Sequence, residues 1–340
     1  TSNTTYTVAT GGAGDVSLNQ AANNLVVDTI TTTNGAVTLV GAANVFELGS
    51  DTTADITTTG AVSVTAGTSI GATGAGALDI ASSTNLTLDS NDDVAVRGSA
   101  QTLTDLTLTV DGGTDGAVYE LTNLANIKET ITTDNTDLTV TALDATGDAN
   151  LSLTNDTGNV TVTSFDTTLA GTLSVTASSG NIILADGALV TGSGGVSLNA
   201  SGTIDESVDA TTTNITTTGT LSLTGGGSIG TTGGGTESLD IAAGTLTATT
   251  SSGGIFLRDP STLTIGSGNV RTTAGNAPIN LEIVAGDLTL DGDITAHGSG
   301  DVDLTLGGAG AAVITSAGTD DIASTSGAIT ITADTLTLVT

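Results

Sequence analysis

The chain has no cysteine, methionine or tryptophan, two prolines, and five aromatic residues among 340. Without cysteine it can form neither disulfides nor thiolate metal sites, although this does not identify the compartment. Only four basic residues face 36 acidic ones, giving a net charge of −32. Such a chain is repelled by nucleic acid and by anionic membrane surfaces. No apolar run approaches the roughly 20 residues needed to span a bilayer. Nucleic-acid binding and membrane insertion are therefore excluded, and cations are the expected charged partners.

The residues that are abundant form a regular pattern. Val, Ile, Leu and Thr alternate in short runs separated by Gly, Asn and Asp, and 37% of the residues are hydrophobic. Val62 and Val64, for example, enclose Ser63 with the period of two that places alternate side chains on opposite faces of a strand. No segment shows a long helical period. The pattern predicts an all-β protein.

The chain contains a long duplication. The segment from Asp51 to Arg97 returns from Asp209 to Arg258, with Gly60 matching Gly219 (219 − 60 = 159). Glu47 and Glu206 keep the same offset, and the two arginines also match. A segment that opens at residue 14 returns at 171 and 327. Because apolar positions and turn glycines stay in step, we interpret this as a structural repeat. We expect repeat 1 over 1–170, repeat 2 over 171–326, and the start of a third over 327–340, in one continuous rod that is part of a longer chain or filament.

A shorter period lies inside each repeat. Ile30, Val37 and Val45 are followed 26, 25 and 25 residues later by the apolar residues Ile56, Val62 and Ile70. Short strands with tight corners and units of this length predict a right-handed parallel β-helix, or β-solenoid, in which each strand pairs with its equivalent one coil away. At roughly 23 residues per coil we expect about 14–15 coils and no capping helix. A string of β-sandwich domains is the alternative fold, and it would need hairpins that close locally.

Four glycines, Gly35, Gly60, Gly194 and Gly219, recur at the predicted corners, where we expect other residues to be strained. The stretch from Gln101 to Asn150 is less regular, and we expect irregular coils and a protruding loop there. A second irregular region is expected around Arg258–Pro260 and Asn276–Pro278.

Metal binding is the first candidate chemistry. Calcium needs six to eight oxygen ligands, and the irregular stretch has the densest spacing of acids. The calcium candidates are Asp111, Asp115, Asp134, Asp137, Asp144 and Asp148. The glycine- and aspartate-rich nonapeptide of calcium-binding toxin repeats does not recur. The alternative is that aspartates occupy turns because they bond locally and keep the rod soluble.

Catalysis finds little support in the sequence, and no catalytic residue is assigned. His297 is the only histidine and lies beside Gly298 in an expected turn. Parallel β-helices also serve polysaccharide lyases, which need a basic residue near acids. Arg97 and Arg258 are the only candidates for that residue. Because they are equivalent in the duplication, we expect each to pair structurally with an aspartate on an adjacent coil.

The segments GAVSVTAGTSIG, GTLSLTGGGSIG and GTLSVTASSGNIIL resemble the repeats of filamentous-haemagglutinin-like exoproteins and giant bacterial surface adhesins. The resemblance implies a secreted parallel β-helix that forms a fibre or stalk at the cell surface. The chain departs from that family in its more variable coil length and in lacking an NPNG-type secretion motif.

These observations favour a non-enzymatic extracellular fibre protein of a prokaryotic surface or matrix. It would join end to end with itself, or with a continuation of the same chain, through uncapped coil ends. The assembly residues we expect are in the last strand pair: Ile329, Ile331, Leu336 and Leu338. The alternatives are the stalk of a secreted adhesin, whose 101–150 loops touch a receptor, and a polysaccharide-active enzyme. Divalent cations and glycans are the other partners considered.

Overall fold

The computed structural model shows an all-β protein whose strands stack in parallel as a β-solenoid. It describes residues 4–49, 51–81, 83, 85–99, 105–110, 117–125, 128–133, 137–146, 150–167, 170–208, 211–231, 238–307, 312–316, 320–333 and 336–339. Two compact units are distinguished: Thr1–Val160 with Ser164–Leu169, and Thr161–Thr163 with Ala170–Thr340. The strand β16 (Asn159–Val162) contributes to both.

The first unit consists of short strands and one 3₁₀ turn, η1 (Gly74–Gly76). Its strands are β1 (Thr4–Ala9), β2 (Val16–Gln20), β3 (Leu25–Thr31), β4 (Val37–Gly41), β5 (Val45–Glu47), β6 (Ile56–Thr57), β7 (Val62–Ala66), β8 (Leu78–Ala81), β9 (Asn85–Ser90), β10 (Val94–Ser99), β11 (Asp105–Val110), β12 (Ala117–Ala125), β13 (Lys128–Thr133), β14 (Asp137–Thr146), β15 (Asn150–Asn155) and β17 (Phe165–Thr167).

The second unit continues the same pattern. Its strands are β18 (Leu173–Ala177), β19 (Ile182–Leu184), β20 (Leu189–Thr191), β21 (Val196–Ala200), β22 (Ile204–Glu206), β23 (Ile215–Gly225), β24 (Leu239–Thr250), β25 (Ile255–Asp259), β26 (Leu263–Thr272), β27 (Ile279–Ile283), β28 (Leu288–Leu290), β29 (Ile294–Ala296), β30 (Val302–Leu306), β31 (Ala312–Ser316), β32 (Ile322–Ser324), β33 (Ile329–Ala333) and β34 (Leu336–Val339).

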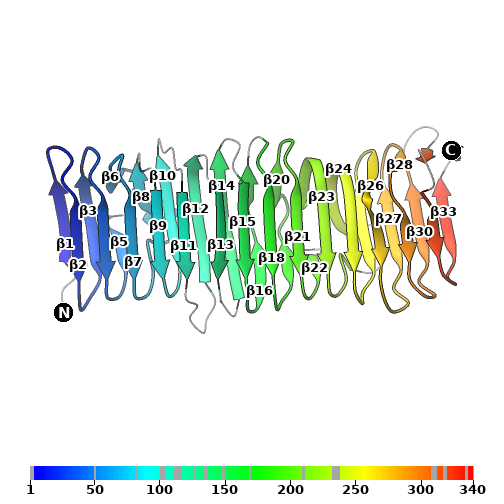
Figure 1. Cartoon of the computed structure of the whole chain (residues 1–340), viewed down its shortest axis with the longest axis horizontal. Coiled ribbons are helices and arrows are strands. Elements are labelled where there is room, and N and C mark those ends of the chain that lie inside the picture. Colours follow the sequence, from blue (N-terminus) through cyan, green and yellow to red (C-terminus); the bar gives the residue numbers. More distant parts are fainter. Residues whose placement is uncertain are drawn as a thin grey trace. The chain divides into compact units, whose positions relative to one another are not determined.

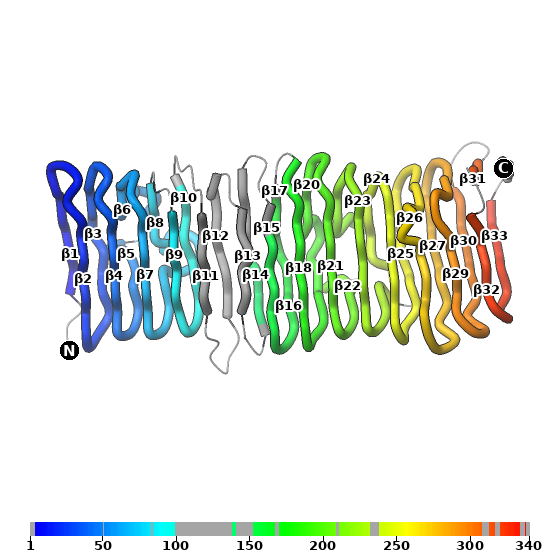
Figure 2. The backbone as a smooth tube through the Cα atoms, viewed as in Figure 1, coloured from blue at the N-terminus to red at the C-terminus, as the bar shows by residue number. Residues whose placement is uncertain are grey.

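The register confirms the period read from the sequence. Ile30 pairs with Ile56 and Val37 with Val62, and Val45 forms a parallel bridge with Ile70. In the first unit β2, β4, β7 and β9 therefore lie side by side (Figure 2). Among the described strands, every pair whose register is defined is parallel. This arrangement excludes the sandwich alternative, because sandwich sheets are built from antiparallel neighbours.

The core is a set of apolar columns inside the coils. In β7 the side chains alternate strictly, with Val62 and Val64 buried and Ser63 and Thr65 partly exposed. Each coil adds such residues over those of the previous coil, so the columns are continuous within a unit. Asp79 breaks the pattern. The period of two places its side chain on the outward face of β8, between the inward-facing Leu78 and Ile80. Outward-facing side chains are normally exposed, but Asp79 is only 3% exposed.

The corner glycines are confirmed, but for a different reason from backbone strain. Gly35 and Gly194 do not have positive φ. Instead, a Cβ on Gly35 would lie 2.1 Å from the carbonyl oxygen of Gly14, and one on Gly194 would lie 1.7 Å from that of Gly171. Successive corners approach too closely for any side chain. A buried threonine fastens each corner: the Thr58 hydroxyl donates to Gly35 O at 2.7 Å and accepts from Gly60 N at 2.9 Å.

The two regions expected to be irregular contain more strand than predicted. Between Gln101 and Asn150 the described residues are strands β11 to β14, which pair in parallel with their neighbours, and the expected protruding loop lies outside the described residues. Arg258 and Asp259 lie within a strand, β25. Pro260 and Asn276–Pro278 lie outside strands, as expected. Among the described residues, no helix is long and apolar enough to cross a membrane.

Candidate functional site

Four ionisable side chains from successive coils meet in the first unit. Glu47 ends β5, Asp55 precedes β6, Asp79 lies in β8, and Arg97 lies in β10. We call these four residues cluster 1. They are far apart in sequence, and the parallel register brings them together, because Arg97 is paired with Asp79 and Asp79 neighbours the Ile56–Ile80 pair.

Arg97 is held by a two-point contact. Its Nε donates to Asp79 Oδ1 at 2.6 Å, and its Nη2 donates to Asp79 Oδ2 at 2.7 Å. The same Nη2 reaches the backbone carbonyl of Asp51 at 2.7 Å. Such bidentate, charge-assisted pairs are stronger and more directional than single contacts. The arginine thus fastens the 48–55 segment over the outward face of β8. The structural pairing expected for Arg97 is confirmed.

The other two acids lack an equivalent cation. Asp55 is 5% exposed, and its Oδ2 accepts the backbone N–H of Asp79 at 2.8 Å. Glu47 is 4% exposed, and its Oε1 is buried without a hydrogen-bond partner. Carboxylate oxygens of Glu47, Asp55 and Asp79 all lie within 4.8 Å of one another. Buried like charges at this separation repel strongly.

This environment changes the proton affinity of the acids. Burial is the main factor that raises the pKa of Asp55 to about 7, and the negative charges of Glu47 and Asp79 add to the increase. The Asp79 N–H bond opposes it. Burial also raises the pKa of Glu47, with the Asp79 carboxylate contributing. Cluster 1 therefore favours species that neutralise negative charge, either a proton or a cation.

The duplication builds a matching cluster 2 in the second unit: Glu206 in β22, Asn214 before β23, Asp240 in β24 and Arg258 in β25. Arg258 Nη1 donates to Asp240 Oδ1 at 2.9 Å, which confirms the second expected pairing. Its Nε also lies 3.8 Å from Glu282 Oε2. Burial raises the pKa of Asp240, and Arg258 opposes the increase. Cluster 2 has asparagine in place of the third acid.

No family model, curated protein or solved structure matches this chain. The function is therefore inferred from the structure of this chain alone.

The calcium candidates do not take part in either cluster. Asp137 and Asp144 lie in β14, at positions where only the backbone is described. Asp111, Asp115, Asp134 and Asp148 lie outside the described residues. The signal for cluster 1 was the retention of Glu47, Asp79 and Arg97 as matched pairs in the duplication. The local density of acidic residues in the sequence does not reveal cluster 1, because its three acids come from separate strands and turns.

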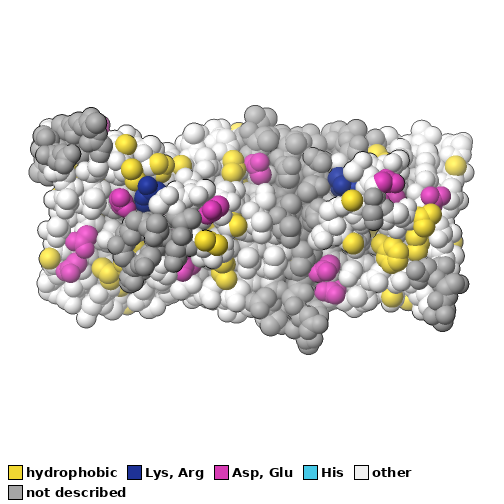
Figure 3. All heavy atoms as spheres, turned by 180° about the vertical axis from the view of Figure 1, so that it is seen from behind, with side chains coloured by type: hydrophobic (Ala, Val, Ile, Leu, Met, Phe, Trp, Pro, Cys, Tyr) yellow, Lys and Arg dark blue, Asp and Glu magenta, His cyan; other side chains and the backbone are white. Residues whose placement is uncertain are grey.

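Elsewhere in the described structure, acidic side chains hold the coils together. Asp15 Oδ1 accepts the N–H of Ala36 at 2.8 Å, and Asp301 Oδ1 accepts that of Ala328 at 2.7 Å. Asp293 does the same for Asp321 at 2.9 Å. These bonds connect neighbouring coils rather than neighbouring residues. On the face drawn in Figure 3, acidic side chains form separate spots over a largely uncharged surface.

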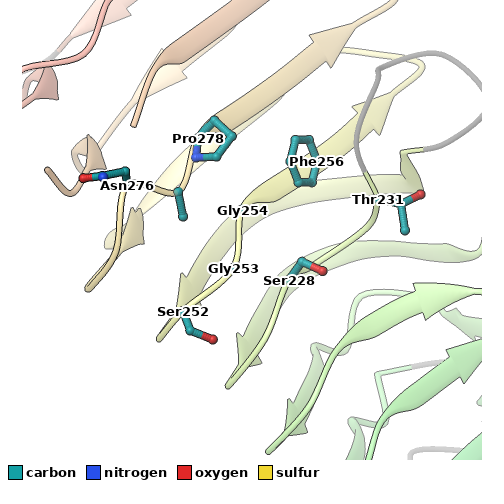
Figure 4. A pocket seen from close by; sticks show the side chains of 9 residues that line it. Ser228, Thr231, Ser252, Gly253, Gly254, Phe256, Asn276 and Pro278 are labelled. Carbon is teal, nitrogen blue, oxygen red and sulfur yellow. The ribbon is translucent and has the colours of Figure 1, made fainter. Parts of the chain in front are cut away.

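A hollow of about 460 Å³ lies in the second unit, lined by Ser, Thr, Asn, Ala and Gly residues with Phe256 and Pro278 (Figure 4). Sugar rings stack on exposed aromatic faces. Phe256 is only 6% exposed, so most of its ring is covered. Phe256 therefore packs in the core, and the hollow carries no functional assignment. His297 lies on the same unit, with Nδ1 3.0 Å from the Gly275 carbonyl oxygen.

Proposed function

We propose that this protein is a structural, non-enzymatic extracellular fibre protein of a prokaryotic surface or matrix, which extends by stacking further coils on its open ends. The observation that carries the proposal is the exposure of Ile329. Its column partners Ile279 and Val302 are fully buried, whereas Ile329 itself is 46% exposed. A further coil would cover it in the same register.

The edge strands support this proposal. Exposed strand edges pair readily with other strands, and proteins usually block them with charged side chains or proline. Here β33 (ITITA) and β34 (LTLV) contain neither, and nor does β1 (TTYTVA) at the other edge. Tyr6 and Val8 in β1 are only partly buried. Head-to-tail pairing of two different edge surfaces gives an unclosed, growing assembly.

The chemistry of the arginines favours a structural role. An enzyme acting on acidic glycans needs an available basic group beside its acids. Arg97 and Arg258 instead each bind a buried aspartate. Their conformations fasten one coil to the next, which suits a protein that carries load along its stack.

Electron microscopy of the purified 340-residue chain tests the proposal. We expect thin filaments whose length increases with protein concentration, and only short particles from Ile329→Asp, because a buried unpaired carboxylate opposes stacking. Thr330→Asp is the matched control, since Thr330 is an exposed neighbour on the opposite face of β33 and its change should leave filaments intact. Discrete wild-type particles at every concentration, or normal filaments from Ile329→Asp, would refute end-to-end assembly of copies.

A further inference from the structure

Cluster 1 has more negative charge than its own arginine can balance. Three carboxylates, Glu47, Asp55 and Asp79, face a single guanidinium, so two negative charges remain without a partner of opposite sign in the cluster. Asp79 alone engages Arg97 through both oxygens. Burying uncompensated charge is costly, and proteins normally pair such groups or use them to bind metals.

The oxygens are placed for a shared ligand. One carboxylate oxygen from each of the three acids lies within 4.8 Å of the other two. Calcium binds oxygen at about 2.3–2.6 Å, so two oxygens on one ion can be up to roughly 5 Å apart. Each carboxylate has about four lone-pair directions, which leaves acceptor capacity on Asp55 and Asp79 beyond their present bonds.

A second observation points to a ligand at the same place. Glu47 is 4% exposed, one of its carboxylate oxygens lies within the acid cluster, and its buried Oε1 has no hydrogen-bond partner. A buried oxygen normally has a partner, and an exception calls for a reason such as an ion. A hollow of about 400 Å³ opens beside it, lined by Glu47 together with Phe46, Ser69 and Asp93. The hollow therefore reaches the cluster at Glu47.

We propose that Glu47, Asp55 and Asp79 bind one calcium ion, with water from the adjoining hollow completing its coordination. The ion would link the coil of β5 and β6 to the coil of β8, and so clamp neighbouring coils. All the protein ligands are oxygens, and their positions on three separate strands or turns suit the flexible coordination of calcium. Cluster 2, which has Asn214 in place of Asp55, lacks the third carboxylate and would bind calcium weakly.

The test uses the full chain and calcium chloride as the probe, in potassium chloride that screens non-specific binding to the acidic surface. Isothermal titration should show one saturable calcium site in the wild type, together with a higher melting temperature. Asp55→Asn should weaken that site by at least about tenfold, because a direct ligand is lost. It should still fold, since asparagine makes the equivalent bond in cluster 2. Circular dichroism verifies this.

Two further variants make the result decisive. Glu47→Gln removes a different ligand and should also lose the site, whereas Glu206→Gln changes the matched residue of cluster 2 and should keep it. Adventitious binding to surface carboxylates would be equal in all four proteins. The proposal is overturned if the wild type shows no saturable site, or if Asp55→Asn and Glu47→Gln bind calcium as the wild type does.

Discussion

Asp55 and Asn214 occupy the same position in the two units and make the same bond. Asp55 Oδ2 accepts the backbone N–H of Asp79 at 2.8 Å, and Asn214 Oδ1 accepts that of Asp240 at 3.0 Å. The coil thus needs a side-chain oxygen at this position but not a charge. The asparagine in the second unit shows that the hydrogen bond of Asp55 is structural. The negative charge of Asp55 must have a different role.

Giving cluster 2 the carboxylate that cluster 1 has at this position leads to the first prediction. Asn214→Asp adds a carboxylate beside Asp240 and Glu206, so without calcium it should lower the free energy of unfolding by about 1–3 kcal/mol. Calcium should restore part of this loss, because the variant completes a second three-acid cluster. Urea unfolding with chelator and with calcium chloride measures both effects. An equal loss in the two conditions would contradict the prediction.

Removing an arginine gives the second prediction. Arg97→Met leaves Asp79 buried without its cation, so we expect a loss of stability on the order of 3 kcal/mol. The side chain of Arg97 is 20% exposed and that of Asp79 is 4% exposed, so solvent screens the pair little. Arg271→Met is the control, because Arg271 is exposed and its loss should change stability by less than about 0.5 kcal/mol. Similar denaturation midpoints for the two variants would refute the argument.

The third prediction concerns the corner threonines. Thr58→Val keeps the shape of the side chain but leaves Gly35 O and Gly60 N without the hydroxyl they contact. We expect a loss of about 1–3 kcal/mol, the cost of unsatisfied buried polar groups. Thr87→Val in β9 changes an exposed threonine and should be nearly neutral. Thermal unfolding of both variants compares them, and equal melting temperatures would count against the hydrogen-bonded corner.

The fourth prediction is a pH dependence. Burial raises the pKa of Asp259 above its ordinary value of 3.8, although the N–H groups of Ser261 and Ala243 oppose this. The folded state therefore holds the proton more tightly than the unfolded state. The stability from this group is complete below the unfolded pKa and declines as pH rises through the folded pKa.

Asp259→Asn should remove that part of the pH dependence, since asparagine does not titrate in this range. The difference in unfolding free energy between wild type and variant, measured by urea unfolding from about pH 4 upward, should fall with a slope on the order of 1 kcal/mol per pH unit until the folded pKa is passed. Asp291→Asn, at an exposed position, is the control. Parallel pH profiles for wild type and Asp259→Asn would show that the group does not titrate as argued.

The coil period could be read from the sequence because it depends on local alternation. Val37 and Val62 had to face inward, and their sequence spacing gave the number of residues per coil. The corner glycines could also be found, but not the reason for them. Contact with the carbonyl of Gly14 exists only when the corner of Gly35 lies over it. The strands β11 to β14 were not predicted, because Thr- and Asn-rich strands resemble loops when their partners are unknown.

Cluster 1 is the feature that could least be predicted from the sequence. The sequence identified Glu47 and Arg97 as matched positions in a duplication, and it led us to expect an aspartate beside each arginine. It could not indicate that Glu47, Asp55 and Asp79 meet, or that Asp79 is buried despite facing outward.

By itself, therefore, the sequence determined the repeating strand, the inward-facing apolar residues, the acidic net charge and the lack of charged residues in the edge strands. These properties follow from residue type and a period of two. The tertiary structure alone decided which acids share one buried space. That outcome depends on the register between coils and on the segment that covers β8, and only the folded chain brings them together.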